Sequence, residues 1–260
     1  MTGSKFAIFG FCLLLALSTT GSGLTFINAL LEKNVTPGEE IYHEITIGLS
    51  GNETAMPAVG GIYDYGMGLD GARIPREDDK EMAPYSAVGF LRLTPESATI
   101  EPGKPAKFVI EGKVPEDVGS GGRYALVEIH TPPQGSGQIG IALATIAPIR
   151  LTISGTDLIE TGEITDLNAT VDEVSLIFKN TGNHHFKASA RAELKDKDGK
   201  IVSSAEAPLM DTALVPTASY LFKMAFKGDT SLAPGTYTAE ASVIHENGTV
   251  LDTEEKAVRV

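Results

Sequence analysis

The chain has 260 residues, of which 42% are apolar and 21% are charged, so it is long enough for one or two domains and is neither disordered nor multi-spanning. Its 34 acidic residues outnumber 21 basic ones, and a net charge of −13 argues against nucleic-acid binding because an acidic surface repels phosphates. A single Cys excludes a disulfide framework, and 28 Gly with 14 Pro favour short strands joined by turns.

The segment from residue 1 to residue 23 is typical of a secretory signal peptide. Lys5 supplies the positive start, residues 6–17 are apolar, and small residues suited to cleavage follow. The apolar run is shorter than the ~20 residues that a bilayer requires, so we expect no membrane span in the mature chain. Four Asn-x-Thr sequons agree with export and are candidate glycosylation sites: Asn34, Asn52, Asn168 and Asn247.

Alternation of apolar and polar residues recurs through the first half of the remaining chain. It predicts strands over residues 41–47, 107–111, 123–130 and 139–153. The last of these places Ile139, Ile141 and Leu143 on one face, and Pro148 lies within it. Because Pro cannot donate a ladder hydrogen bond, we expect this strand to lie at a sheet edge, or to be bulged or divided at Pro148.

The second half has the same character. It predicts strands over residues 174–178, 190–195, 220–226, 236–245 and 250–260, with hairpin turns at residues 196–200 and 246–249. A spacing also repeats between the halves, because Pro102, Phe108 and Tyr124 are followed by Pro216, Phe222 and Tyr237 at nearly equal offsets.

This repeat predicts an all-β chain of two tandem immunoglobulin-like sandwiches. We expect the first over residues 24–155 and the second, of immunoglobulin or fibronectin-III type, over residues 156–260. Tyr124 and Tyr237 each open a strand just after a turn, which is the position of a structural tyrosine corner.

Turn and strand motifs between residues 85 and 153 carry a family resemblance. The strings EPGK at 101–104, VPED at 114–117 and GRY at 122–124 occur in an order that resembles the periplasmic pilus-chaperone fold. The order is more similar to the first domain of WxL-interacting cell-surface proteins of Gram-positive bacteria and similar exported archaeal proteins. For surface proteins the resemblance implies attachment to the cell envelope or to partner proteins.

For pilus chaperones the resemblance implies that an alternating edge strand completes a partner's sandwich. Basic residues in a cleft grip the partner's terminal carboxylate in that family. The strand over residues 139–153 matches the first feature, whereas Arg150 lies on the strand itself and matches the basic pair poorly.

We predict that residues 63–81 form a long acidic loop on the first sandwich. Long loops on rigid sandwiches often carry binding, so the candidate partner contacts are Tyr63, Tyr65 and Met67 here, with Ile139, Ile141 and Leu143 on the edge strand. The acidic side chains are candidate Ca²⁺ ligands, although a solvated acidic loop is the preferred interpretation because their spacing is not that of an EF-hand: Asp64, Asp70, Glu77, Asp78 and Asp79.

Three further patterns argue against catalysis and cofactors. No Cys remains after residue 23 and no Gly-x-Ser-x-Gly motif occurs, so we expect no enzyme. The GxGxxG string at residues 135–140 precedes a strand rather than a helix, so we expect no nucleotide cofactor. His184 and His185 should point to opposite faces in an exposed turn, so we expect no metal there.

These patterns together predict a secreted, cell-envelope-associated protein that binds an envelope or surface protein. Binding would use edge-strand pairing and the Tyr/Asp-rich loop, in an adhesion or scaffold role. One alternative is a periplasmic-type chaperone for exported or pilus subunits, which predicts a deep cleft between angled domains with a Lys or Arg at its base. A carbohydrate-binding accessory module is the other alternative, and the absence of Trp disfavours it.

Overall fold

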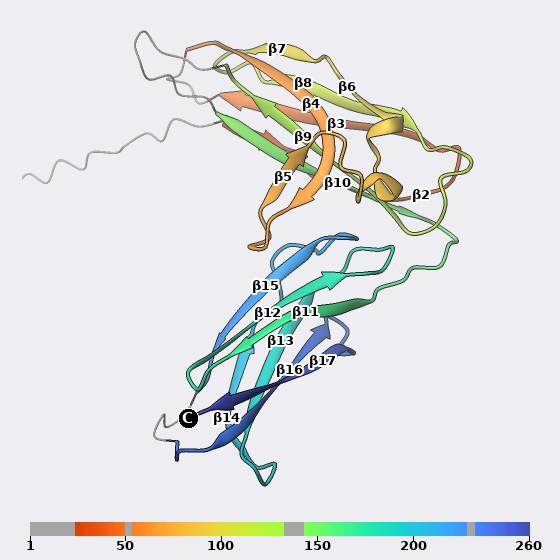
Figure 1. Cartoon of the computed structure of the whole chain (residues 1–260). Coiled ribbons are helices and arrows are strands. Elements are labelled where there is room, and N and C mark those ends of the chain that lie inside the picture. Colours follow the sequence, from red (N-terminus) through yellow and green to blue (C-terminus); the bar gives the residue numbers. More distant parts are fainter. Residues whose placement is uncertain (1–23, 50–53, 133–142, 228–231) are drawn as a thin grey trace, which may run out of the picture.

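The computed structural model describes residues 24–49, 54–132, 143–227 and 232–260. Strands dominate this part of the chain, with two short 3₁₀ segments between them, so the fold is all-β as the alternating pattern predicts. Figure 1 shows two immunoglobulin-like sandwiches, one built from β1–β10 and the other from β11–β17. The predicted signal peptide, residues 1–23, lies outside the described residues.

The first sandwich packs a four-stranded sheet on a six-stranded sheet. The smaller has the order β1-β3-β8-β6, and the larger has the order β2-β10-β9-β4-β5 with β7 also paired to β4. The strands are β1 Leu24–Ile27, β2 Leu31–Val35, β3 Glu40–Leu49, β4 Met56–Met67, β5 Arg73–Arg76, β6 Leu91–Thr94, β7 Ser97–Ile100, β8 Ala106–Lys113, β9 Gly122–His130 and β10 Ala144–Ile153. The 3₁₀ segments η1 Ala83–Tyr85 and η2 Val88–Phe90 connect β5 to β6.

Alternating side chains of these two sheets fill the first core. Ile45 and Phe108 of the smaller sheet and Val127 and Ile149 of the larger one are fully buried in a single cluster. Each such side chain contributes about 1.5–3 kcal/mol relative to exposure. The period of two in the sequence therefore predicted which face of these strands points inward.

Strand β9 departs from simple alternation because it is buried on both faces. Its core-facing residues Ala125, Val127 and Ile129 belong to the first core, as the sequence predicts. On the opposite face, Tyr124 and Leu126 are also fully buried, in a separate cluster that includes Val215 of the second sandwich. The second sandwich therefore covers the outer face of the first.

The second sandwich has the sheets β11-β12-β15 and β14-β13-β16-β17. Its strands are β11 Gly162–Ala169, β12 Glu173–Asn180, β13 Ala188–Lys195, β14 Ile201–Ala207, β15 Ser219–Ala225, β16 Thr236–His245 and β17 Val250–Arg259. Phe178, Phe186 and Phe222 lie at the centre of its core. Both predicted hairpins form, with Gly199 and Gly248 at φ of 77° and 91°, a conformation that favours glycine.

The prediction of a loop over residues 63–81 is wrong for its first part. Strand β4 continues to Met67 and forms a hairpin with β5, which Gly68 closes by donating its backbone N–H to the Ala72 carbonyl at 2.8 Å. The strand was hidden in the sequence because Gly60, Gly61 and Gly66 interrupt its alternation. Gly66 is needed where it lies, since a Cβ there would come within 2.4 Å of the Ile74 carbonyl oxygen.

The two predicted tyrosine corners have different outcomes. The Tyr237 hydroxyl donates to the Ala233 carbonyl at 3.0 Å, four residues upstream, which is the predicted arrangement. The Tyr124 prediction is wrong, because its hydroxyl meets the Nδ1 of His185 in the second sandwich at 3.1 Å. The same local sequence thus leads to two different contacts.

Replacing Tyr237 with Phe should lower the free energy of unfolding of the second sandwich by about 1 kcal/mol, since it removes one hydrogen bond and leaves a carbonyl unpaired. Urea titration followed by circular dichroism measures this loss. The matched control is Tyr42→Phe, because Tyr42 is 71% exposed and its hydroxyl should add nothing. Equal stability of Tyr237→Phe and the parent chain would contradict the corner's role.

Candidate functional site

Strand β10 is paired on both sides over only half of its length. It is antiparallel to β9 from Ala144 to Thr152, whereas its parallel partner β2 begins opposite Ile149. Among the residues that the structure describes, no strand pairs with residues 144–148 on the side away from β9. We call residues 144–148 the open edge.

The direction of the backbone groups along β10 follows from three hydrogen bonds. The Leu143 carbonyl accepts from Thr131 N–H at 2.8 Å, and Ile153 N–H donates to Gly121 at 2.9 Å, both toward the β9 side. Ser154 N–H donates to Val35 at 2.7 Å, toward the β2 side. Since neighbouring residues point to opposite sides and the register has no shift, the even-numbered residues point away from β9.

Ala144 and Ile146 therefore direct both of their backbone groups out from the open edge. Pro148 has the same parity, so its missing N–H falls on the outward side and leaves the ladder with β9 intact. The expectation that Pro148 marks a sheet edge is confirmed, and the strand is neither bulged nor divided there. An unpaired row of this kind is a template for a further strand.

Apolar side chains surround the open edge. Leu143 is 38% exposed although its parity is that of the buried Ala147 and Ile149. Ile27 and Leu30, which flank the passage of the chain from β1 to β2, are also exposed. Leu143 thus leaves an apolar side chain exposed at the start of the open edge.

The structure places the sequence-predicted contact residues in different surroundings. Ile139 and Ile141 lie outside the described residues, and Tyr63 is half-buried on β4. Tyr65 is buried and accepts a hydrogen bond from Arg73 Nε at 3.1 Å, while Met67 packs on the second core. The expectation that Tyr65 and Met67 present themselves to a partner is therefore wrong in this structure, because the second sandwich covers them.

We call the contact surface between the two sandwiches the joint, and it lies beside the open edge. The tip of the β4–β5 hairpin reaches the second sandwich, where Leu221 N–H donates to the Leu69 carbonyl at 2.8 Å (Figure 1). Gly71 at this tip approaches the ring of Tyr220 so closely that a Cβ would lie 3.2 Å from it. The residues predicted to form a free loop therefore form a hairpin that contacts the second sandwich. We call this hairpin the clamp.

Asn183 ties the joint to the linker between the sandwiches. Its side chain accepts from Ile159 N–H at 2.7 Å and donates to the Asp157 carbonyl at 3.0 Å and to the Ser120 hydroxyl at 3.3 Å. Its carbonyl accepts from Gly122 N–H at 2.8 Å. A Cβ on Gly121 would lie 2.3 Å from this carbonyl oxygen, so glycine permits the close approach.

The prediction that His184 and His185 lie in an exposed turn is wrong. Each side chain is only 12% exposed, and the two rings lie 4.3 Å apart at the joint. His184 contacts Thr152 of β10 at 3.0 Å and Glu160 of the linker at 2.7 Å. No sequence signal pointed to this role, because the partners are distant along the chain.

Glu160 links two histidines of the second sandwich. Its carboxylate lies 2.7 Å from His184 Nδ1 and 3.0 Å from His245 Nε2. His245 Nδ1 accepts the backbone N–H of Asn247 at 3.0 Å, so its Nε2 carries the proton that it donates to Glu160. The linker is thereby held against the second sandwich.

A pocket of about 400 Å³ lies beside the joint. The pocket is lined by Glu32, Lys33, Asn34, Thr152, Leu158, His184 and His185. Arg150 forms an ion pair with Glu32, and its Nε is buried without a hydrogen-bond partner among the described residues. The charge of Arg150 is therefore already paired with a carboxylate that lines this pocket.

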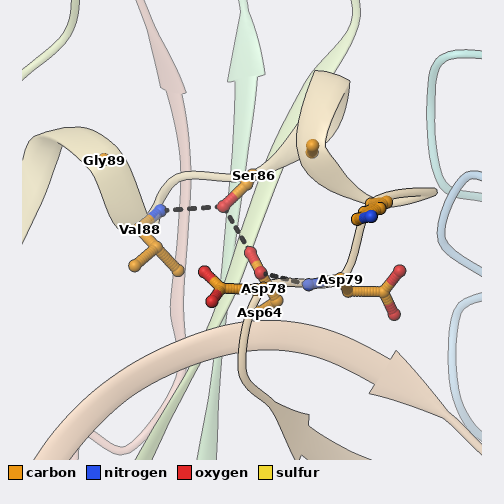
Figure 2. Close-up of a pocket in the computed structure, with 8 residues that line it drawn as sticks. Asp64, Asp78, Asp79, Ser86, Val88 and Gly89 are labelled. Carbon is orange, nitrogen blue, oxygen red and sulfur yellow. Dashed lines mark hydrogen bonds between the residues drawn. The ribbon is translucent and has the colours of Figure 1, made fainter.

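Three of the candidate Ca²⁺ ligands, Asp64, Asp70 and Asp79, accept hydrogen bonds from other residues of the chain. Figure 2 shows Asp64 accepting hydrogen bonds from the Ser86 hydroxyl and from Asp79 N–H, at 2.5 and 3.0 Å, on the wall of a pocket of about 520 Å³. Asp78 and Asp79 line the same pocket, whereas Asp70 caps the β4–β5 turn and Glu77 follows β5. Within the described residues, no group of three metal-binding side chains is placed to hold an ion.

The sequons lie at exposed positions where the structure describes them. Asn34 is on β2, Asn168 is on β11 and Asn247 is in the β16–β17 turn, all exposed, while Asn52 lies outside the described residues. The described part of the chain also contains no helix long and apolar enough to cross a membrane.

Comparisons with known proteins find structural neighbours only. No family model matches the chain, and no curated protein matches it. Solved structures that match include the periplasmic chaperone SfaE (11% identity, TM-score 0.40, 92% of this chain and 100% of that one). Others are the E. coli chaperone DraB (11%, 0.41, 90% and 98%) and the Salmonella enterica SafA pilin–SafB chaperone complex (11%, 0.42, 92% and 98%).

Replacing Asn183 with Ala should uncouple the sandwiches, because it removes three side-chain hydrogen bonds across the joint and linker. We expect a loss of about 1–3 kcal/mol and a splitting of the single unfolding transition into two. Scanning calorimetry of the full chain measures both effects. Asn247→Ala is the matched control, since its side chain bonds only to Thr249 N–H within one turn. A single unshifted transition for Asn183→Ala would contradict the role of this residue.

Proposed function

We propose that this chain is an exported, non-catalytic binding protein that pairs the open edge of β10 with a strand of a partner protein at the cell envelope. The observation that supports the proposal is the unpaired outward side of Ala144 and Ile146, whereas residues 149–153 of the same strand are paired on both sides. Addition of a strand to such an edge is a general mode of peptide recognition.

The chemistry of the open edge fits an extended segment with alternating apolar side chains. Ala144 and Ile146 offer two N–H donors and two carbonyl acceptors. Each backbone hydrogen bond contributes about 0.5–1.5 kcal/mol net. The inward side chains of the added strand would cover Leu143, which adds apolar burial to the backbone pairing.

The envelope location rests on the sequence. Residues 1–23 have the features of a secretory signal, and the motif order between residues 85 and 153 resembles that of envelope-attached surface proteins. An adhesion or scaffold role follows if the partner is an anchored surface protein. The exposed sequon residues Asn34, Asn168 and Asn247 remain candidate glycosylation sites in that setting.

A chaperone for exported subunits is a second candidate function. The observation that favours it is the basic side chain of Arg150, which pairs with Glu32 of the pocket beside the joint, because a basic residue where two domains meet is what this function requires. The ion pair with Glu32 argues for the first candidate, since it leaves Arg150 without free charge for a partner. In a chaperone, the partner would lose solubility when this chain is withheld, whereas a surface partner would stay folded alone.

Replacing Ala144 with Pro should weaken partner binding about tenfold or more. The change removes one outward N–H donor and places a ring in the path of the added strand, but it leaves the ladder with β9 intact, as Pro148 already shows. Retention of a partner from envelope extract, quantified against bait concentration, measures the effect. Ala144→Gly is the matched control because it keeps the N–H and should retain the partner.

The comparison of these two variants decides the proposal. Equal retention by Ala144→Pro, Ala144→Gly and the parent chain would show that the partner does not use the open edge. A melting temperature of Ala144→Pro within a few degrees of the parent confirms that loss of binding reflects the edge and not unfolding.

A further inference from the structure

His185 is an enclosed titratable side chain at the joint. Its ring stands edge-on to Tyr124 with centroids 5.6 Å apart, and the Tyr124 hydroxyl meets its Nδ1 at 3.1 Å. Only 12% of the His185 side chain is exposed, so the ring is enclosed between the two sandwiches. Enclosure of this kind favours the neutral imidazole, because burial removes the water that would stabilise its charge.

The groups packed around His185 give little support to a positive charge. Arg150 of β10 and the adjacent His184 raise the cost of protonation, and Glu32 of β2 lies 4.0 Å from Nε2 but is already paired with Arg150. Glu160 of the linker bonds to His184 and His245 instead, and Lys33 of β2 lines the adjacent pocket. The Glu32 carboxylate that faces His185 is therefore already balanced by the charge of Arg150.

We propose that His185 makes the joint pH-sensitive: acidification opens the contact between the two sandwiches because the enclosed imidazole of His185 takes up a proton more readily when the joint is open. The closed joint buries Tyr124, Leu126 and Val215, and the open joint exposes them to water. The effect depends on one imidazole that is enclosed between the two sandwiches when they are in contact.

The direction of the effect follows from the pKa of His185. Burial, with His184 and Arg150 nearby, lowers this pKa from 6.5 to about 3 in the closed joint. A group with a depressed pKa binds more protons in the open state between these two values. The closed state is therefore fully favoured above about pH 6.5 and loses its advantage as the pH falls toward 3.

The size of the effect can be stated as a ratio. Between about pH 7.5 and about pH 5, proton linkage through a single site with these two pKa values increases the open-to-closed ratio about 30-fold. The consequence for binding rests on the proposed function: Arg150 and Thr152 of the joint continue the same strand as the open edge. Opening of the joint would thus uncover apolar surface next to the site where the partner strand pairs.

Amide hydrogen exchange of the full chain tests the proposal without any partner. The amides of Gly122 and Leu221 donate across the joint, to Asn183 and Leu69, so their protection factors report its opening. We expect both factors to fall about 30-fold between pH 7.5 and pH 5. The amides of Val114 and Phe226, each bonded within one sandwich, should keep their protection over the same range.

Variants assign the effect to His185. In His185→Gln the amide oxygen accepts from Tyr124 and does not titrate, so the pH response of Gly122 should disappear. His184→Gln is the matched control and should keep the response. A protection factor at Gly122 that changes less than threefold in the parent chain would overturn the proposal, and so would a full response in His185→Gln or its loss in His184→Gln. If His185→Gln does not fold, the parent chain and His184→Gln still decide the outcome.

Discussion

The apolar side chains on the outer face of β9 must be shielded from water, and the arrangement of the two sandwiches follows from this constraint. Tyr124 and Leu126 point away from the first core, yet both are fully buried. Val215 from the second sandwich, Tyr65 from the β4–β5 hairpin and Met82 complete the buried cluster around them. Burial of such large side chains stabilises the joint by several kcal/mol and holds the two sandwiches in contact.

The same arrangement leaves one half of β10 without a neighbour. The N-terminal strand is divided between the two sheets, since β1 pairs with β3 and β2 pairs with β10, and the chain crosses between them at Asn28 with φ of 57°. Among the described residues, no strand lies beside residues 144–148 on this side, because pairing with β2 begins only at Ile149. Pro148 fits at this boundary because its parity removes only an outward donor. The open edge and the joint therefore lie on consecutive parts of one strand.

The sequence was sufficient for features that depend on local pattern. Alternation predicted the inward faces of β9, and Asp-Gly and Asn-Gly turns predicted the second-sandwich hairpins. The sequence was insufficient where a residue far away along the chain determines the contact that a side chain makes. Tyr124 and Tyr237 share a Gly-x-Tyr string, but only Tyr237 meets a local carbonyl, since His185 takes the Tyr124 hydroxyl. The clamp formed by β4 and β5 was likewise hidden, because its glycines serve close backbone approaches that no local rule marks.

The central claim is that the outward backbone groups of the open edge are unpaired in the free protein and available to a strand. Residue-resolved amide exchange of the full chain in the absence of any partner tests it most directly. The account predicts rapid exchange at Ala144 and Ile146, and slow exchange at Thr145 and Ala147, whose amides point toward β9. Slow exchange at all four positions would show that the chain itself already covers this edge, and would contradict the account.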